Sequence, residues 1–246
     1  MMDLDANDVE FSCGAERLRG YLAVPREGGP RPGIVLIPDV HGLSDFYREM
    51  AARFARDGFA VLTADLYVRE GAPKLADAAA AMRFIAGLPD SRVLGDLEAA
   101  ARFLGAHPRV GGRPVGITGF CMGGQYAVLA ACTISPIAAC VSFYGMVRYP
   151  ERNEKKPRSP LDAAADLVCP YLGIFGADDA LIPRADVEEL RAKLQAAGKR
   201  FEIVSYEGAG HAFLNSSRAD AYRPEAAADA FRRAIEFFRR ELGGTR

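Results

Sequence analysis

The sequence predicts an α/β fold: a mostly parallel central sheet with helices on both faces. Short, continuous apolar runs alternate along the chain with longer segments of helical spacing. Most of the runs lack polar alternation, as strands do when both faces of their sheet are covered. The 246 residues contain no repeat, low-complexity tract or linker, so we expect a single domain over residues 1–246.

The expected elements follow from these patterns in chain order. Seven strands are expected, at residues 20–24, 33–38, 60–64, 115–119, 139–144, 171–175 and 201–206. Six helices are expected, at residues 44–56, 74–86, 92–106, 122–131, 183–197 and 224–242. Pro183 and Pro224 suit the first helical position, where a missing N–H costs nothing. The polar stretch 147–160, which contains three prolines, is expected to be an exposed loop able to overhang a site.

The composition excludes several classes of protein. With 31 Lys and Arg against 32 Asp and Glu, the formal net charge is -1, without the basic excess of a nucleic-acid-binding protein. Half of the residues are hydrophobic, which excludes an intrinsically disordered chain. Residues 1–10 have no apolar run, and no segment approaches the ~20 apolar residues of a membrane span. We expect a cytoplasmic protein that binds neither nucleic acid nor membrane.

The cysteines point to free thiols. They stand at positions 13, 121, 132, 140 and 169, an odd set without a C-x-x-C pair. This pattern argues against a disulfide framework and against a structural zinc site. Packing is the default role of Cys13, Cys132, Cys140 and Cys169.

Cys121 differs from the other four because residues 119–123 read G-x-C-x-G between an expected strand and an expected helix. A sharp turn of this kind brings the residues two before and two after its tip together, and only very small side chains fit there. The N-terminal N–H groups of the helix then stabilise a thiolate or an oxyanion. Glycine-rich turns also bind phosphate, but the dinucleotide and P-loop spacings are absent. The motif predicts that Cys121 is a nucleophile.

A nucleophilic thiol needs a general base, and the base needs a carboxylate that orients it. Of the three histidines, His107 is expected in an exposed turn, whereas His41 and His211 each follow a strand. We favour His211 over His41 because nucleophile, acid and histidine follow one another in this order in hydrolases with such a turn. Asp178 and Asp179 both fit the acid, and the pattern alone does not choose between them.

Taken together, these motifs resemble the dienelactone hydrolase family of α/β-hydrolases, which are cysteine hydrolases. The resemblance extends over nearly the whole chain, through residues 33–42, 64–67, 95–100, 119–124, 142–145, 179–183 and 210–213. It implies the α/β-hydrolase fold and hydrolysis of a small ester or lactone of the dienelactone type. It implies neither a cofactor nor a metal.

The same resemblance implies the roles of the catalytic residues. Cys121 matches the nucleophile and His211 the base, and Asp179, in the setting D-x-x-I-P, matches the orienting acid in preference to Asp178. In such an enzyme the thiol attacks the substrate carbonyl to give a thioester acyl-enzyme, which water then hydrolyses.

Four further positions correspond to family site residues. The oxyanion donors map onto the backbone N–H groups of Met122 and Val40, and Tyr144 matches a tyrosine that lines the family's pocket. Asp39 stands where the best-known members have a glutamate that holds the resting thiol. A carboxylate one methylene shorter reaches about 1.5 Å less.

Two substrate-binding arginines of the family have no counterpart here. Residues 77–81 contain no arginine, and Asn215 stands at the second position. Arg83 and Arg148 are the candidate replacements. A general small-acyl carboxylesterase or thioesterase is therefore the alternative function, and a redox-sensing thiol on a hydrolase scaffold is a further one.

Overall fold

The computed structural model describes residues 2–243. Its strands are β1 (Leu4–Cys13), β2 (Glu16–Pro25), β3 (Gly33–Ile37), β4 (Ala60–Ala64), β5 (Val115–Phe120), β6 (Ile137–Phe143), β7 (Tyr171–Gly176) and β8 (Phe201–Tyr206). Its helices are α1 (Asp45–Arg56), α2 (Ala78–Gly87), α3 (Asp90–Ala106), α4 (Met122–Thr133), α5 (Pro160–Ala163), the 3₁₀ turn η1 (Ala164–Asp166), α6 (Arg184–Ala196) and α7 (Pro224–Leu242).

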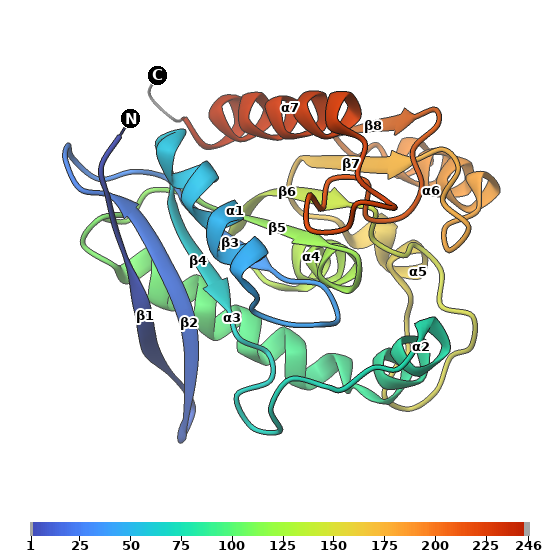
Figure 1. The fold of residues 1–246 in the computed structure, drawn as a ribbon, viewed down its shortest axis with the longest axis horizontal. Helices are drawn as coiled ribbons and strands as arrows, with labels where there is room; N and C mark the ends of the chain where they lie inside the picture. The colour runs from blue at the N-terminus through green and yellow to red at the C-terminus, as the bar shows by residue number, and fades with distance from the viewer. Residues whose placement is uncertain (1, 244–246) are drawn as a thin grey trace.

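The strands form one eight-stranded sheet in the order β1-β2-β4-β3-β5-β6-β7-β8 (Figure 1). Pairing is parallel from β4 through β8, while β1 and β2 add antiparallel at one edge. The predicted fold class is confirmed, and all seven predicted strands are present. The prediction missed β1, because this edge strand is polar and mostly exposed and so lacks an apolar run.

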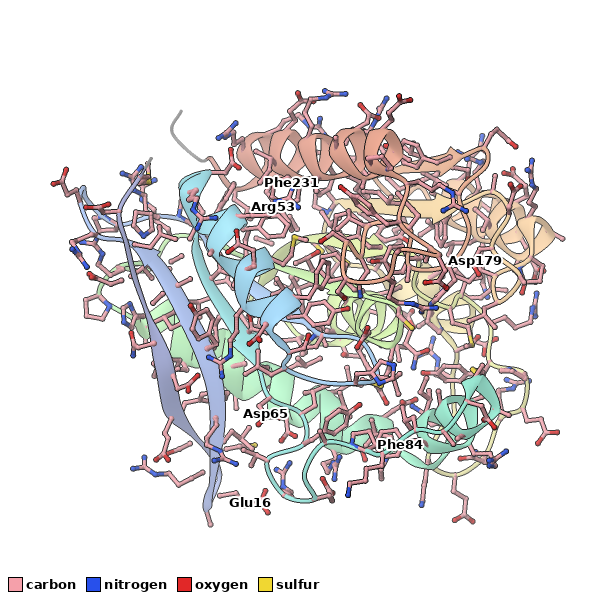
Figure 2. The ribbon with its side chains drawn as sticks, in the orientation of Figure 1. Glu16, Arg53, Asp65, Phe84, Asp179 and Phe231 are labelled. Atoms are coloured by element: carbon pink, nitrogen blue, oxygen red, sulfur yellow. The ribbon has the colours of Figure 1, made fainter. Side chains whose placement is uncertain are left out.

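Helices cover both faces of the sheet, as Figure 1 shows. Gly116 of β5 faces Phe238 of α7, whereas its neighbour Val115 and the paired Gly33 face the side of α3. α1 lies on the α7 side, where Arg53 stacks on Phe231 with its guanidinium carbon 4.0 Å from the ring centre (Figure 2). α4 packs against α3 on the opposite face.

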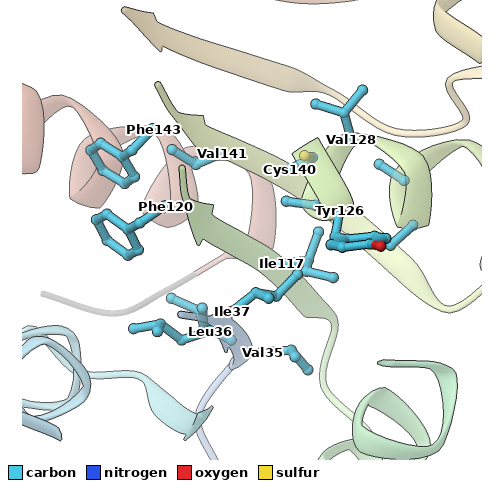
Figure 3. Close-up of a cluster of buried hydrophobic side chains, with 14 of the residues drawn as sticks. Val35, Leu36, Ile37, Ile117, Phe120, Tyr126, Val128, Cys140, Val141 and Phe143 are labelled. Carbon is cyan, nitrogen blue, oxygen red and sulfur yellow. The ribbon is translucent and has the colours of Figure 1, made fainter. Parts of the chain in front are cut away.

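The core around β5 and β6 supports the candidate site, which follows these two strands. Phe120 and Phe143 are register partners, and their rings stack 4.6 Å apart with an interplanar angle of 3° (Figure 3). Ile117 and Cys140 are likewise paired and fully buried. This packing fixes the ends of both strands, from which the site is built.

The stretch 147–160 is not the fully exposed loop that its polarity predicts. Lys156 is only 1% exposed, and its Nζ donates to Asp90 Oδ1 of α3 and to the Tyr126 hydroxyl of α4, at 2.5 Å each. The ring of Tyr149 also lies beside Nζ. Burial lowers the pKa of Lys156, and the hydrogen bond to Asp90 opposes that shift. A buried ion pair therefore ties this loop to the helices beneath it.

The second helix also begins later than predicted. The structure starts α2 at Ala78 because the Asp77 carboxylate accepts the N–H of Ala80 at 2.7 Å and caps the helix. Over residues 2–243, no helix combines the length and the apolar character needed to cross a membrane.

Candidate active site

The backbone bends sharply at Cys121, between β5 and α4. Its φ of 56° and ψ of -118° lie in a region that side-chain-bearing residues rarely occupy. A Cβ atom on Gly119 would stand 2.0 Å from the carbonyl oxygen of Gly123, and one on Gly123 would stand 2.2 Å from that of Ile37. Only glycine fits either position, so the G-x-C-x-G spacing has the steric cause that the sequence suggested.

A cavity of about 340 Å³ lies over Cys121 at the carboxyl ends of the strands. Met82, Ile85, Met146 and Leu181 contribute apolar surface. Its polar and charged lining residues are Asp39, His41, Asp77, Cys121, Gln125, His211 and Arg218. Within residues 2–243 there is no group of three or more His, Cys, Asp or Glu side chains arranged to hold a metal ion.

The structure brings His211 and Asp179 together. His211 Nδ1 lies 2.7 Å from Asp179 Oδ2, and the Leu181 N–H donates to Oδ1 of the same carboxylate at 2.9 Å. The Asp179 side chain is completely buried, whereas Asp178 is exposed and pairs with Arg184. Of the two adjacent carboxylates, only Asp179 contacts the histidine.

Burial alone would disfavour a charge on His211. The hydrogen bond to Asp179 and the interaction with Cys121 outweigh burial and raise the pKa of His211 to about 10. Nε2, the other ring nitrogen, is buried and has no hydrogen-bond partner among the residues that the structure describes. His211 therefore has one nitrogen fixed by a carboxylate and the other free to exchange a proton near the thiol.

Two backbone N–H groups beside Cys121 are available to an oxyanion. Those of Val40 and Met122 have no acceptor anywhere in residues 2–243. Met122 is the first residue of α4, where an N–H has no partner within the helix. Val40 is held by Tyr67, whose hydroxyl donates to the Val40 carbonyl at 3.0 Å.

Asp39, Tyr144 and His41 take different places around the thiol. Asp39 lines the cavity, but its Oδ1 accepts the N–H of His41, and no hydrogen bond to Cys121 is formed within the described part of the chain. Tyr144 does not line the cavity; its ring packs edge-on against His211 at 5.4 Å. A direct contact of Tyr144 with substrate stays a prediction. His41 is exposed at the rim, without the carboxylate that orients His211.

Neither proposed replacement arginine lies in this cavity. Arg148 pairs with Asp186 and Glu189 on the surface, and Arg83 lines a neighbouring pocket. The cavity cation is instead Arg218, which the sequence analysis missed. Its position in the turn that follows His211 was the available signal, but a turn's sequence does not reveal which way it folds back.

The fold and the turn at Cys121 are those of an α/β-hydrolase. Comparison with known proteins agrees: residues 18–242 match the dienelactone hydrolase family. A Bradyrhizobium protein named as a 2-oxo-3-(5-oxofuran-2-ylidene)propanoate lactonase is 37% identical over 238 residues, covering 97% of this chain and 95% of that protein. An Escherichia coli K12 protein named as a carboxymethylenebutenolidase is 34% identical, covering 93% of this chain and 84% of its own.

Solved structures lead to the same family. A crystal structure of a Klebsiella pneumoniae protein, described as a dienelactone hydrolase, superposes with a TM-score of 0.91 at 33% identity, covering 96% of this chain and 98% of the other. The chain belongs to the dienelactone hydrolase family and is an ester or lactone hydrolase of that type.

The raised pKa of His211 predicts the effect of Asp179→Asn. Loss of the carboxylate removes the largest interaction that opposes burial, so the pKa of His211 should fall below 10. NMR titration of the ring protons measures this directly, since the chain has three histidines. Asp178→Asn is the matched control and should leave the titration in place. A midpoint near 10 in Asp179→Asn would contradict the assignment.

Proposed function

We propose that the protein hydrolyses a carboxylic ester or lactone with Cys121 as nucleophile, His211 as general base and Asp179 as the acid that orients the base. One observation carries the proposal. The strained turn presents Cys121 in the same cavity as a histidine whose far nitrogen is bound to a buried carboxylate.

The reaction begins with proton transfer from the Cys121 thiol to Nε2 of His211. The sulfur attacks the substrate carbonyl carbon, and the N–H groups of Met122 and Val40 donate to the resulting oxyanion. Collapse breaks the bond to the ester oxygen, which takes the proton from His211 as it leaves. The product of this half-reaction is a thioester on Cys121.

The second half-reaction repeats these steps with water. His211 removes a proton from the water, the hydroxyl adds to the thioester carbonyl, and the same two N–H groups stabilise the oxyanion. Collapse expels the Cys121 sulfur, which recovers a proton from His211. Throughout, Asp179 keeps Nδ1 protonated and stabilises the imidazolium that forms.

All five cysteines are free, which supports a reducing, cytoplasmic setting.

One cation of the cavity lining, Arg218, can bind a substrate carboxylate, although Asp39 and Asp77 also line the cavity. Arg218 lines the cavity, and its guanidinium provides a fork of donors for a carboxylate. The name of the Bradyrhizobium relative describes a lactone that carries a carboxylate. We therefore propose an anionic lactone of the carboxymethylenebutenolide class as substrate, in preference to a neutral ester.

Replacement of the nucleophile should abolish turnover. Cys121→Ala is expected to lower kcat/KM for an activated aryl ester by at least about 1000-fold, because covalent attack is lost while oxyanion donors and binding remain. Cys13→Ala is the control: Cys13 is the other half-buried cysteine, and burial raises its pKa. Activity of Cys121→Ala within tenfold of the wild type would exclude Cys121 as nucleophile.

Arg218→Gln should weaken binding of an anionic lactone. A hydrogen bond to a charged group contributes about 1.5–3 kcal/mol, and because Arg218 is half exposed we expect the lower end, a roughly tenfold rise in KM. Steady-state kinetics on a carboxylate-bearing lactone and a neutral short-chain ester measure the difference. Arg148→Gln, on the surface, is the control. An equal effect of Arg218→Gln on both substrates would favour the general carboxylesterase.

A further inference from the structure

A second pocket lies beside the catalytic cavity, between α2 and residues 146–156. It has a volume of about 240 Å³ and shares three wall residues with the catalytic cavity: Met82, Ile85 and Met146. We call it the side pocket. Because the two spaces have these walls in common, the side pocket lies directly next to the catalytic cavity.

The lining of the side pocket suits an uncharged group. Its surface is mostly apolar, and Tyr149 adds an aromatic ring to the three shared residues. Lys156 reaches the pocket, but its charge is compensated by Asp90. Arg83 and Glu151 are exposed and carry opposite charges. No net charge therefore faces the interior.

The wall that the two spaces share can deform at low cost. Methionine has an unbranched, flexible side chain that adapts to what it contacts, and two of the three wall residues are methionines. α2, which supplies Met82, has Ile85 as its one buried residue. Helices with few buried contacts shift at low cost.

We propose that the side pocket is a subsite for an apolar substituent, an alkyl chain or an aromatic ring, of the ester whose carbonyl lies at Cys121. This inference rests on the proposed function and extends it to larger substrates. The volume suffices: an apolar protein cavity of about 150 Å³ already holds benzene.

Filling the side pocket tests the inference. Ala86 lines it from α2 and is exposed, so Ala86→Trp narrows the pocket without disturbing the core. Ala79→Trp is the matched control, because Ala79 is an exposed residue of the same helix that lines neither space. The substrates are aryl esters of straight-chain acids from two to eight carbons, and acetates of the corresponding alcohols.

The readout is the ratio of kcat/KM for long and short esters within each protein. In the wild type and in Ala79→Trp the ratio should rise by up to roughly fourfold per methylene buried. In Ala86→Trp this rise should be lost in the acyl or the alcohol series. Identical chain-length profiles in all three proteins would overturn the subsite alone. Failure of the wild type to turn over both these esters and a carboxylate-bearing lactone would overturn the proposed function itself.

Gln125 supports a second, independent inference. It lies one helical turn after Cys121, lines the catalytic cavity and is fully buried. Neither its amide nitrogen nor its amide oxygen has a hydrogen-bond partner among the described residues. Buried side-chain amides are almost always paired, so an unpaired one beside a nucleophile indicates a missing ligand.

We infer that Gln125 determines specificity by donating from Nε2 to a second carbonyl or carboxylate oxygen of the substrate. A site with a buried donor rejects a substrate that lacks the acceptor, because the donor is then left unpaired. The amide thus selects an ester or lactone with a further oxygen, and it acts beside Cys121 without taking part in bond breaking.

Gln125→Leu separates this role from a structural one. Selectivity for a keto ester over the ester in which a methylidene group replaces the keto oxygen should fall at least about tenfold, and the Tm should stay level or rise as an unpaired buried amide is removed. Gln195→Leu, an exposed position on α6, is the control. Unchanged selectivity, or a lower Tm with equal loss on both esters, would overturn the inference.

Discussion

The site depends on the bend at Cys121. A backbone at positive φ costs about 1–3 kcal/mol unless its surroundings hold it in place. Here the Cys121 N–H donates to Phe143 at 3.0 Å, and the Cys121 carbonyl accepts the N–H of Gly124 at 2.9 Å. The stacked rings of Phe120 and Phe143 lock the strand ends on either side. The strain is thus maintained by backbone hydrogen bonds and by buried aromatic packing.

That bend also decides the electrostatics around the thiol. It directs the first N–H groups of α4 toward the cavity and sets the sulfur close enough to His211 to contribute to the raised pKa of that histidine. The Asp179 carboxylate, completely buried, would be unstable without partners. It has two, the Leu181 N–H and the His211 ring. The proposed acid and base therefore stabilise each other, while the turn positions the proposed nucleophile.

The sequence predicts well those elements and turns that local sterics and periodicity determine. Seven strands were predictable from apolar runs, and the bend at Cys121 was predictable because Gly119 and Gly123 leave no room for a side chain. The edge strand β1 was not, since a polar, exposed strand carries no such signal. Lys156 was assigned to an exposed loop because its partner Asp90 lies 66 residues away.

The cavity lining was the least predictable part for the same reason. Arg218 reaches the cavity because of the path of its turn, and Gln125 because of the rotation of α4. Tertiary packing sets both. The same packing leaves unpaired polar atoms in the cavity lining. Within residues 2–243, His211 Nε2 and both side-chain amide atoms of Gln125, two residues that line the cavity, are buried without a hydrogen-bond partner.

A protein interior normally pairs such groups, and each unpaired one lowers stability. In the cavity these atoms lie above β5, every residue of which is buried. Polar atoms that form no hydrogen bond within the protein can bond to a bound molecule. Such hydrogen bonds are stronger in a cavity that excludes water. The strained bend and these unpaired atoms share one cavity, and in the proposed function the substrate supplies the missing hydrogen-bond partners.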